Sequence, residues 1–264
     1  MKLTVLEDNY TYIDMYYLGE PAVSYFIEDE DERILFDTGY SDAFISNAEK
    51  MNIDLDDIDK IVLSHGHIDH TGGLPFLSDR KNRYKLIAHP DTFEHREFED
   101  GMDIGSPLNR VETEKLFDLS VSKDPIRISK HLTYLGEIKT RCDFEPRYSI
   151  GRIRGNEPDY IYDDSAMVYE SDKGLFIITG CSHSGICNII EQAKEVCHEN
   201  RVYGVIGGFH LFEDNERLDK TIDYFKDNEI ELLYPCHCVS LLAKIKMGKK
   251  LDIKEVGVGL EIII

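Results

Sequence analysis

Tryptophan is absent from this chain of 264 residues, and basic residues are scarce: 30 lysines and arginines stand against 51 aspartates and glutamates. The resulting formal net charge of −21 would repel a nucleic-acid backbone or an anionic membrane surface. We therefore expect neither nucleic acid nor membrane among the partners. Internal repeats, low-complexity tracts and Pro/Gly linkers are also missing, which favours a single domain over residues 1–264.

Long apolar runs are missing too. No segment approaches the ~20 apolar residues of a membrane-spanning helix, and the opening MKLTVLEDNYTYID is too polar for a secretory peptide. Six cysteines do not make a disulfide framework in a chain of this length, and four of them lie within two residues of a histidine. These absences favour a cytoplasmic protein with reduced thiols.

Apolar periodicity predicts the secondary structure of a globular protein. The first half opens with strands alone, whereas strands and helices alternate in the second half, so we expect the α/β class. Expected strands cover residues 10–18, 22–29, 32–39, 60–64, 85–89, 131–136, 166–171, 174–180, 203–208, 231–235 and 258–264. Expected helices cover residues 42–51, 112–117, 186–199, 216–228 and 240–247, with another beginning beyond residue 73. The mixed, charged segment at about 91–149 is expected to be an insertion beside the active site.

One segment, LSHGHIDHTGG over residues 63–73, concentrates metal ligands directly after an apolar strand. Three histidines and an aspartate fall within six positions: His65, His67, Asp69 and His70. Imidazole and carboxylate are the usual ligands of Zn²⁺, Mn²⁺ and Fe. A strand-to-helix turn lets all four side chains converge, which a regular helix or strand would not. We therefore predict a metal site here.

The motif His65-Gly66-His67-Ile68-Asp69-His70 resembles the HxHxDH signature of the metallo-β-lactamase superfamily, and Asp37-Thr38-Gly39 resembles its upstream aspartate motif. The resemblance implies a four-layer αββα sandwich with two divalent metal ions, most simply zinc, with manganese, iron or magnesium as alternatives. It also implies that His65 and His67 bind one ion and that Asp69 and His70 belong to the second. Asp37 would then orient a ligand, and Asp69 is in addition a catalytic candidate.

The remaining ligands are expected after later apolar strands, at Cys181 and His183, at His210 and at His237. In an extended backbone, side chains two positions apart share a face, so Cys181 and His183 could both face the metals. We favour His183 as the direct ligand and keep Cys181 as a possible one. By the same alternation His237, and not its two neighbouring cysteines, is expected to face the site.

Three further residues are candidates for substrate or catalysis. His210 remains open between a metal ligand, a catalytic or substrate contact, and a cap on the preceding glycine turn. His89 ends the strand that follows the metal motif and is expected to contact substrate, as is Asp164. Arginines of the insertion, Arg96 among them, could hold a phosphate group, although a solvated surface is the simpler explanation.

A second resemblance extends along nearly the whole chain, through ILFDTG, SHGHIDHTGGL, AHPDTF, YLGEI, the DDSA of residues 163–166, TGCSHSGI, GGFHL and PCHC. This order is similar to the 7,8-dihydropterin-6-methyl-4-(β-D-ribofuranosyl)aminobenzene 5′-phosphate synthase-like branch of the superfamily. Two positions depart from that branch: Lys139-Thr140 replaces Pro-Arg after YLGEI, and Val239-Ser240 replaces Thr-Gly after PCHC. These changes affect the expected substrate and leave the expected fold unchanged.

The expected function is that of a hydrolase whose two metal ions activate water against a phosphoryl or acyl substrate. A transferase of the synthase type, which releases diphosphate, is the first alternative. A non-catalytic metal-bound sensor is the second, because binding and catalysis need the same ligands. We expect a small-molecule substrate carrying phosphate; the oligomeric state does not follow from the sequence.

Overall fold

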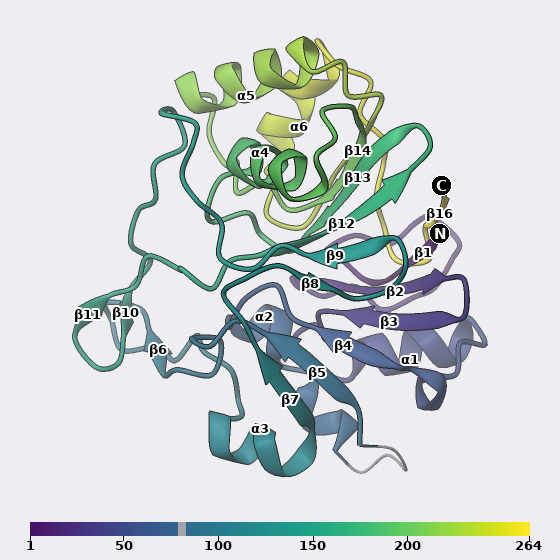
Figure 1. Cartoon of the computed structure of the whole chain (residues 1–264), viewed down its shortest axis with the longest axis vertical. Coiled ribbons are helices and arrows are strands. Elements are labelled where there is room, and N and C mark those ends of the chain that lie inside the picture. Colours follow the sequence, from purple (N-terminus) through teal and green to yellow (C-terminus); the bar gives the residue numbers. More distant parts are fainter. Residues whose placement is uncertain (79–82) are drawn as a thin grey trace. The chain divides into compact units, whose positions relative to one another are not determined.

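The computed structural model describes residues 1–78 and 83–264, and the chain divides into two compact units (Figure 1). Unit 1 comprises residues 1–123, 148–163 and 257–264, and unit 2 comprises residues 124–147 and 164–256. The expected insertion at about 91–149 is therefore shared, since its middle part, residues 124–147, belongs to unit 2. The expectation of a single domain stays a prediction.

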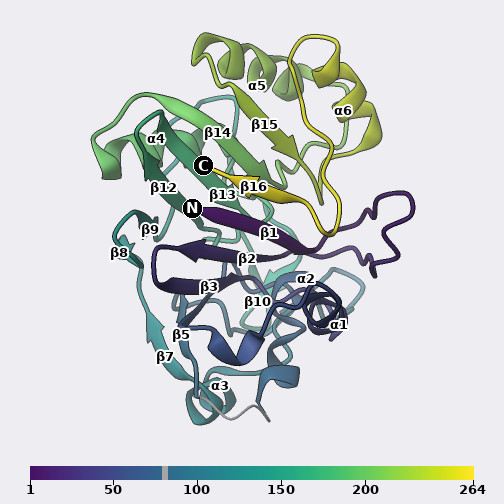
Figure 2. The same ribbon diagram turned by 90° about the vertical axis from the view of Figure 1, so that its right-hand side faces the viewer.

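Unit 1 contains a seven-stranded sheet that opens antiparallel, as expected, and becomes parallel from its fourth strand onward. In spatial order the strands are β16 (Glu261–Ile263), β1 (Lys2–Glu7), β2 (Ser24–Asp29), β3 (Glu32–Phe36), β4 (Lys60–Val62), β5 (Lys85–Ala88) and β7 (Asp118–Val121). The two chain termini lie side by side on β1 and β16, where the N-terminal amine of Met1 donates to the carbonyl of Ile264 at 3.0 Å (Figure 2).

Helices of unit 1 cover one face of this sheet. They are α1 (Ala43–Lys50), α2 (Ile68–Thr71) and α3 (Arg110–Leu116), with 3₁₀ turns η1 (Leu55–Asp57) and η2 (Leu74–Leu77). The amphipathic α1 buries Phe44 and Ala48 in one cluster with Leu35, Ile61 and Leu86 of three adjacent strands. A small second sheet joins β6 (Arg96–Glu97), β10 (Arg152–Ile153) and β11 (Glu157–Pro158).

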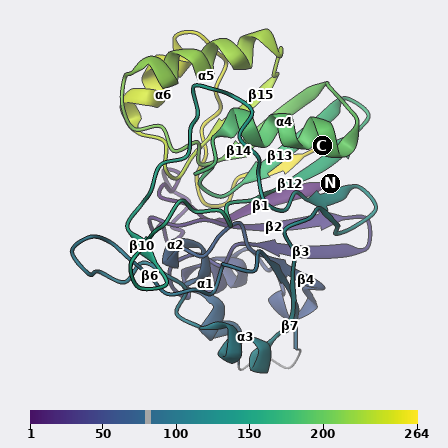
Figure 3. The same cartoon turned by 60° about the vertical axis from the view of Figure 1, so that its left-hand side comes forward.

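Unit 2 contains a six-stranded sheet whose last three strands along the chain run parallel. In spatial order the strands are β15 (Leu232–Pro235), β14 (Val202–Gly207), β13 (Gly174–Thr179), β12 (Ala166–Ser171), β9 (Leu132–Tyr134) and β8 (Ile126–Arg127). Its helices are α4 (Ile186–Cys197), α5 (Glu216–Asp227) and α6 (Leu241–Gly248). Figure 3 shows α4 lying along these strands, and Ile189 and Ile190 of α4 share a buried cluster with Ile177 and Val205.

Most expected elements are confirmed within one to three residues of their ends. The strand expected over residues 10–18 is wrong. There Thr11 makes a single bridge to Val258, Asp14 and Tyr16 have positive φ angles of 66° and 51°, and Tyr16 is 81% exposed. The helix expected beyond residue 73 is reduced to the 3₁₀ turn η2, and its expected continuation through residues 79–82 lies outside the described residues.

Two of the expected absences can be compared with the structure. Within the described residues, no helix is long and apolar enough to cross a membrane. All six cysteines lie in the described part of the chain, and none is paired in a disulfide.

Candidate metal centre

The parallel part of the sheet in unit 1 determines where its polar residues gather. Asp37 follows β3, His65 follows β4 and His89 follows β5, and these three strands are neighbours that run in the same direction. The carboxyl ends of parallel strands meet at one edge of a sheet, which is where such sheets bind ligands. The polar residues that follow these three strands therefore lie at the same edge of the sheet.

The motif itself forms the expected strand-to-helix turn. His67 is the residue immediately before the short helix α2, and its carbonyl accepts a hydrogen bond from the hydroxyl of Thr71 at 2.9 Å. Gly66 has to be glycine, because a Cβ atom there would lie 2.1 Å from the carbonyl oxygen of Thr92. The close packing of this backbone brings the histidines on either side of Gly66 together.

His65 and His67 present ring nitrogens to each other: Nε2 of His65 lies 3.0 Å from Nδ1 of His67. Nδ1 of His65 lies 2.9 Å from the hydroxyl of Ser64, which fixes the orientation of the ring. Burial, assisted by the charge of Arg96, lowers the pKa of His67 from 6.5 to about 4, so this ring is neutral at physiological pH. A neutral imidazole is the form that binds a metal.

His70 is oriented by the carboxylate that the sequence singled out. Its Nδ1 lies 2.7 Å from Oδ2 of Asp37, and both side chains are fully buried. The same carboxylate accepts hydrogen bonds from the backbone and the hydroxyl of Ser64, each at 2.7 Å. When Nδ1 of His70 carries the proton, Nε2 carries the lone pair that can bind a metal. Nε2 lies 3.6 Å from Oδ2 of Asp69. Asp69 itself is partly exposed, with 30% of its side chain accessible.

In unit 2, candidate ligands likewise follow three neighbouring parallel strands. Cys181 and His183 follow β13, His210 follows β14 and His237 follows β15. The backbone is not extended here, since Ser182, His210 and His237 have φ angles of 60°, 50° and 48°. The alternation rule, by which both Cys181 and His183 could face the metals, therefore does not apply. The strand ends still gather at one edge of the sheet.

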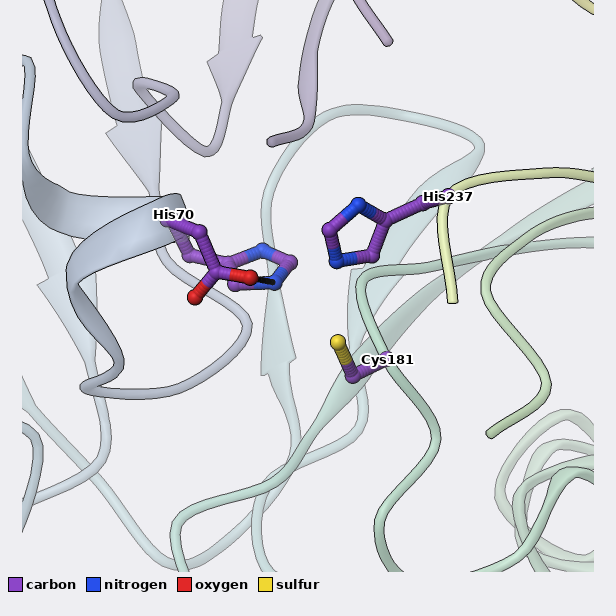
Figure 4. Close-up of side chains that lie close together, drawn as sticks. His70, Cys181 and His237 are labelled. Atoms are coloured by element: carbon purple, nitrogen blue, oxygen red, sulfur yellow. Dashed lines mark ion pairs between the residues drawn. The ribbon is translucent and has the colours of Figure 1, made fainter. Parts of the chain in front are cut away.

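Two pairs of candidate ligands form within unit 2. Sγ of Cys181 and a ring nitrogen of His237 lie within 4.8 Å of each other, and both side chains are buried (Figure 4). The rings of His183 and His210 lie with their centroids 4.4 Å apart. The thiol of Cys238 donates to the carbonyl of Cys181 at 3.3 Å. These contacts keep Cys181 in consideration beside His183.

Two expected substrate contacts lie deeper than the sequence suggested. Asp164 is fully buried, and its Oδ2 accepts hydrogen bonds from both the backbone N–H of Ser184, at 2.8 Å, and its hydroxyl. His89 is also fully buried, and its Nδ1 accepts from the backbone of Asp91 at 3.1 Å. Their roles as substrate contacts stay predictions.

The sequence did not reveal the partnership between Arg96 and Asp163. Nη2 of Arg96 lies 2.7 Å from Oδ1 of Asp163, and both side chains are fully buried. Burial acts to raise the pKa of Asp163, but the charge and hydrogen bond of Arg96 outweigh it and keep that pKa below its ordinary value. In the sequence, Asp163 was noted only as part of the DDSA motif, which did not indicate Arg96 as its partner.

The residues in both units fit divalent metal ions. Zn–N bonds of about 2.0–2.1 Å at a tetrahedral centre place two ligand nitrogens about 3.3 Å apart, close to the separation of the His65 and His67 nitrogens. Imidazole, carboxylate and thiolate groups are all ligands of divalent transition-metal ions. Asp37 supplies the carboxylate partner that metal-bound histidines usually have.

Comparisons with known proteins agree with this reading. A sequence model of the metallo-β-lactamase superfamily matches residues 18–195. The chain belongs to the metallo-β-lactamase superfamily. The α/β metallo-β-lactamase fold class expected from the sequence is thereby confirmed.

One of the similar proteins carries the name of the expected branch. The chain is 32% identical to the 7,8-dihydropterin-6-methyl-4-(β-D-ribofuranosyl)-aminobenzene-5′-phosphate synthase of Methanocaldococcus jannaschii, over 92% of this chain and 89% of the relative. It is 31% identical to an uncharacterised protein of the same organism, over 94% of both chains. A solved structure described as a metal-dependent hydrolase of the β-lactamase superfamily has a TM-score of 0.86 at 27% identity, covering 100% of this chain and 99% of that one.

Proposed function

We propose that this chain is a metal-dependent enzyme of hydrolase type, in which two divalent ions, most simply zinc, act on a phosphoryl or acyl substrate. The observation that carries the proposal is the loop of unit 1, where four ligand residues follow one strand and Asp37 orients one of them from behind. Ions bound there would lower the pKa of a water molecule and stabilise developing negative charge.

The pairings within each unit suggest how the ligands are shared. In unit 1, His65 pairs with His67, and Asp69 lies beside His70. In unit 2, Cys181 lies beside His237, and His183 beside His210. We propose that the two residues of each pair supply ligands to the same divalent ion, and that Cys181 and His183 are both candidate ligands within unit 2.

Two side chains are proposed to handle protons. The ring of His210 is partly exposed and packs edge-on against Phe212, with centroids 4.7 Å apart, so it can reach both solvent and substrate. We assign to it the delivery of a proton to the leaving group. The carboxylate of Asp69 is partly exposed. One of its oxygens could accept a proton from the attacking water while the other binds metal.

The synthase reaction is the second candidate, and the 32% identity to the named synthase is the observation that favours it. In that reaction the same cations would neutralise a departing diphosphate while an aniline acceptor enters. The net charge of −21 makes an anionic substrate dependent on bound cations in either case. A phosphorylated small molecule fits both reactions.

Elemental analysis of the purified protein, followed by a substrate screen, tests the proposal. The screen contains phosphodiester, lactone, thioester and diphosphate substrates, each with added Zn²⁺, Mn²⁺ or Mg²⁺. About two ions per chain with hydrolytic turnover would support the hydrolase. Turnover only of a dihydropterin diphosphate with an aniline acceptor would establish the synthase. A protein that binds no metal under any of these conditions would refute both.

A further inference from the structure

A buried ion pair in unit 1 lies outside the set of metal ligands. Arg96 of β6 is fully buried, and its Nη2 contacts Oδ1 of Asp163 at 2.7 Å and donates to the carbonyl of Asp91 at 3.1 Å. Its Nη1 lies 3.3 Å from Oδ2 of Asp159. A buried arginine is expensive unless its charge is paired, and a buried pair adds little net stability to a fold. Fold stability alone therefore gives a weak reason for its presence.

The second oxygen of Asp163 connects this pair to the metal motif. Oδ2 of Asp163 accepts a hydrogen bond from the backbone N–H of Gly66 at 2.7 Å. Gly66 is the residue between His65 and His67, so its peptide fixes the backbone positions from which both side chains extend. On another side the same glycine packs against the carbonyl of Thr92, which a Cβ atom would approach to 2.1 Å. The peptide is thus held from two sides by the segment that begins at Asp91 and by Asp163.

The chemistry of this chain of contacts suits a positioning role. An ionised carboxylate makes shorter and stronger hydrogen bonds than a neutral acceptor does. Arg96 occupies Oδ1 of Asp163 and so directs Oδ2 to the N–H of Gly66. Without that bond the Gly66 peptide would have to find water or another acceptor, and the separation of 3.0 Å between the two ring nitrogens would relax.

We propose that Arg96 and Asp163 are positioning residues of the metal centre, holding the Gly66 peptide so that His65 and His67 face each other before an ion arrives. This inference rests on the proposed function, since it presumes that the two histidines bind metal. It assigns Arg96 to the metal loop and not to a substrate phosphate. Three further arginines of the segment 91–149 also have partners: Arg110 pairs with Glu114, Arg127 with Glu170, and Arg147 donates to the carbonyl of Ile138.

Two double variants separate the hydrogen bond from the charges. Arg96→Met with Asp163→Asn removes both charges together and keeps an amide oxygen that can accept from Gly66. Arg96→Met with Asp163→Ala removes the charges and the acceptor. Removing the charges as a pair avoids an uncompensated buried ion, which is the costly outcome of a single substitution. The two proteins therefore differ mainly at the Gly66 hydrogen bond.

The readouts are zinc affinity by competition with a chromophoric chelator, and the visible spectrum of the cobalt(II)-substituted protein. We expect the variant with alanine to lose roughly 10–100-fold in affinity and to show an altered cobalt spectrum. The variant with asparagine is expected to lose clearly less affinity than the variant with alanine, because its amide oxygen can still accept from Gly66 although neither the charge nor Arg96 strengthens that bond. Arg152→Met serves as the control. Arg152 lies in the neighbouring strand β10 and forms an exposed ion pair with Glu99, so its loss should leave the zinc affinity and the cobalt spectrum unchanged.

Equal losses in the two double variants would overturn the inference, as would wild-type affinity in the variant with alanine. Failure of the wild-type protein to bind zinc would instead refute the proposed function. Should the alanine variant not fold, hydrogen exchange in the metal-free protein gives a second test. The segment 63–73 is then expected to exchange faster in Arg96→Lys than in wild type, because lysine offers one ammonium in place of the planar guanidinium. Unchanged exchange would contradict the proposal.

Discussion

Nδ1 of His70 lies 2.7 Å from Oδ2 of Asp37, with both side chains closed off from solvent. The carboxylate selects the tautomer in which Nδ1 carries the proton and Nε2 carries the lone pair that can bind a cation. Asp37 has a backbone φ angle of 57°, in the left-handed region that aspartate tolerates better than most residues other than glycine.

Replacing Asp37 is therefore expected to weaken metal binding. In Asp37→Ala, His70 loses its orienting partner, and we expect zinc affinity to fall by roughly 10–100-fold. Asp37→Asn is a sharper test, because an amide NH₂ facing Nδ1 would favour the opposite tautomer. Competition with a chelator measures both variants. Wild-type affinity in Asp37→Asn would show that the carboxylate does not set the tautomer.

The ligand assignment in unit 1 predicts loss of metal with retention of fold. His67→Ala or Asp69→Ala should bind less metal per chain and lose turnover, while the circular dichroism spectrum stays that of wild type. His95→Ala is the matched control, because the His95 side chain is 60% exposed in the same unit and outside the metal loop. A variant that kept both its metal content and its turnover would refute the assignment.

Cys181 and Cys238 give a direct test of the ligand that the sequence left open. Cys181 lies near His237, whereas the thiol of Cys238 is engaged with the carbonyl of Cys181. In cobalt(II)-substituted protein a thiolate ligand gives a charge-transfer absorption in the near ultraviolet. We expect this band to disappear in Cys181→Ser and to persist in Cys238→Ser. Absence of the band from wild type would leave His183 as the ligand after β13.

Ser184 is expected to stabilise the loop that carries His183. Its backbone N–H and hydroxyl both donate to Oδ2 of the buried Asp164. Ser184→Ala removes one donor from a buried carboxylate, so the free energy of unfolding should fall by about 1–3 kcal/mol. Urea denaturation of the metal-free protein measures it. Ser171→Ala, at the partly exposed turn between β12 and β13, is the control and should cost less.

Where local pattern and topology agree, the sequence predicts which side chains gather at one edge of a sheet. Asp37 and His65 each come directly after a short apolar strand, and the parallel pairing of β3 with β4 brings the two ends together. The same holds for Cys181 and His237 in unit 2, which follow β13 and β15. Strand ends can be predicted from sequence because apolar runs stop there. Parallel pairing then places the carboxyl ends of the strands at the same edge of the sheet.

The segment of residues 10–18 shows where periodicity misleads. Its tyrosines alternate as in a strand, yet the backbone turns at Asp14 and the aromatic rings serve another purpose. Rings of Tyr12 and Tyr17 lie against Gly257 and Gly259, which have no side chain to exclude them. Contacts with glycines at the far end of the chain leave no trace in a local pattern. The strand β1, at Lys2–Glu7, which lies between β16 and β2, was missed because its apolar run is short.

Arg96 shows the limit for charged residues. In sequence it lies among acids and aromatics, which is typical of a solvated surface, and its partner Asp163 comes 67 residues later. Burial of a charge depends on a partner brought by tertiary structure, so composition alone could not reveal it. The same is true of Glu7, a carboxyl in β1 that the sequence gave no reason to single out.

Glu7 is fully buried against the turn of Asp37-Thr38-Gly39, so closely that a Cβ atom on Gly39 would lie 1.8 Å from its Oε2. Burial, together with the hydrogen bond and charge of the Glu20 carboxyl, raises the pKa of Glu7 from 4.5 to about 9. The folded protein therefore holds this proton more tightly than the unfolded chain does. Its contribution to stability is complete below pH 4.5 and is lost as the pH rises towards 9.

Glu7→Gln is expected to remove this pH dependence, because the amide is neutral throughout and similar in shape. The free energy of unfolding of wild type minus that of Glu7→Gln should fall with rising pH between 4.5 and about 9, by up to about 1.4 kcal/mol per pH unit. Urea denaturation of both metal-free proteins at several pH values measures it, since the protons linked to other groups, His67 among them, are the same in the two proteins and cancel in the difference. Glu114→Gln, an exposed residue of α3, should run parallel to wild type. A difference that stays constant from pH 5 to 9 would mean that Glu7 is ionised in the fold, and its closeness to Gly39 would then be a matter of packing alone.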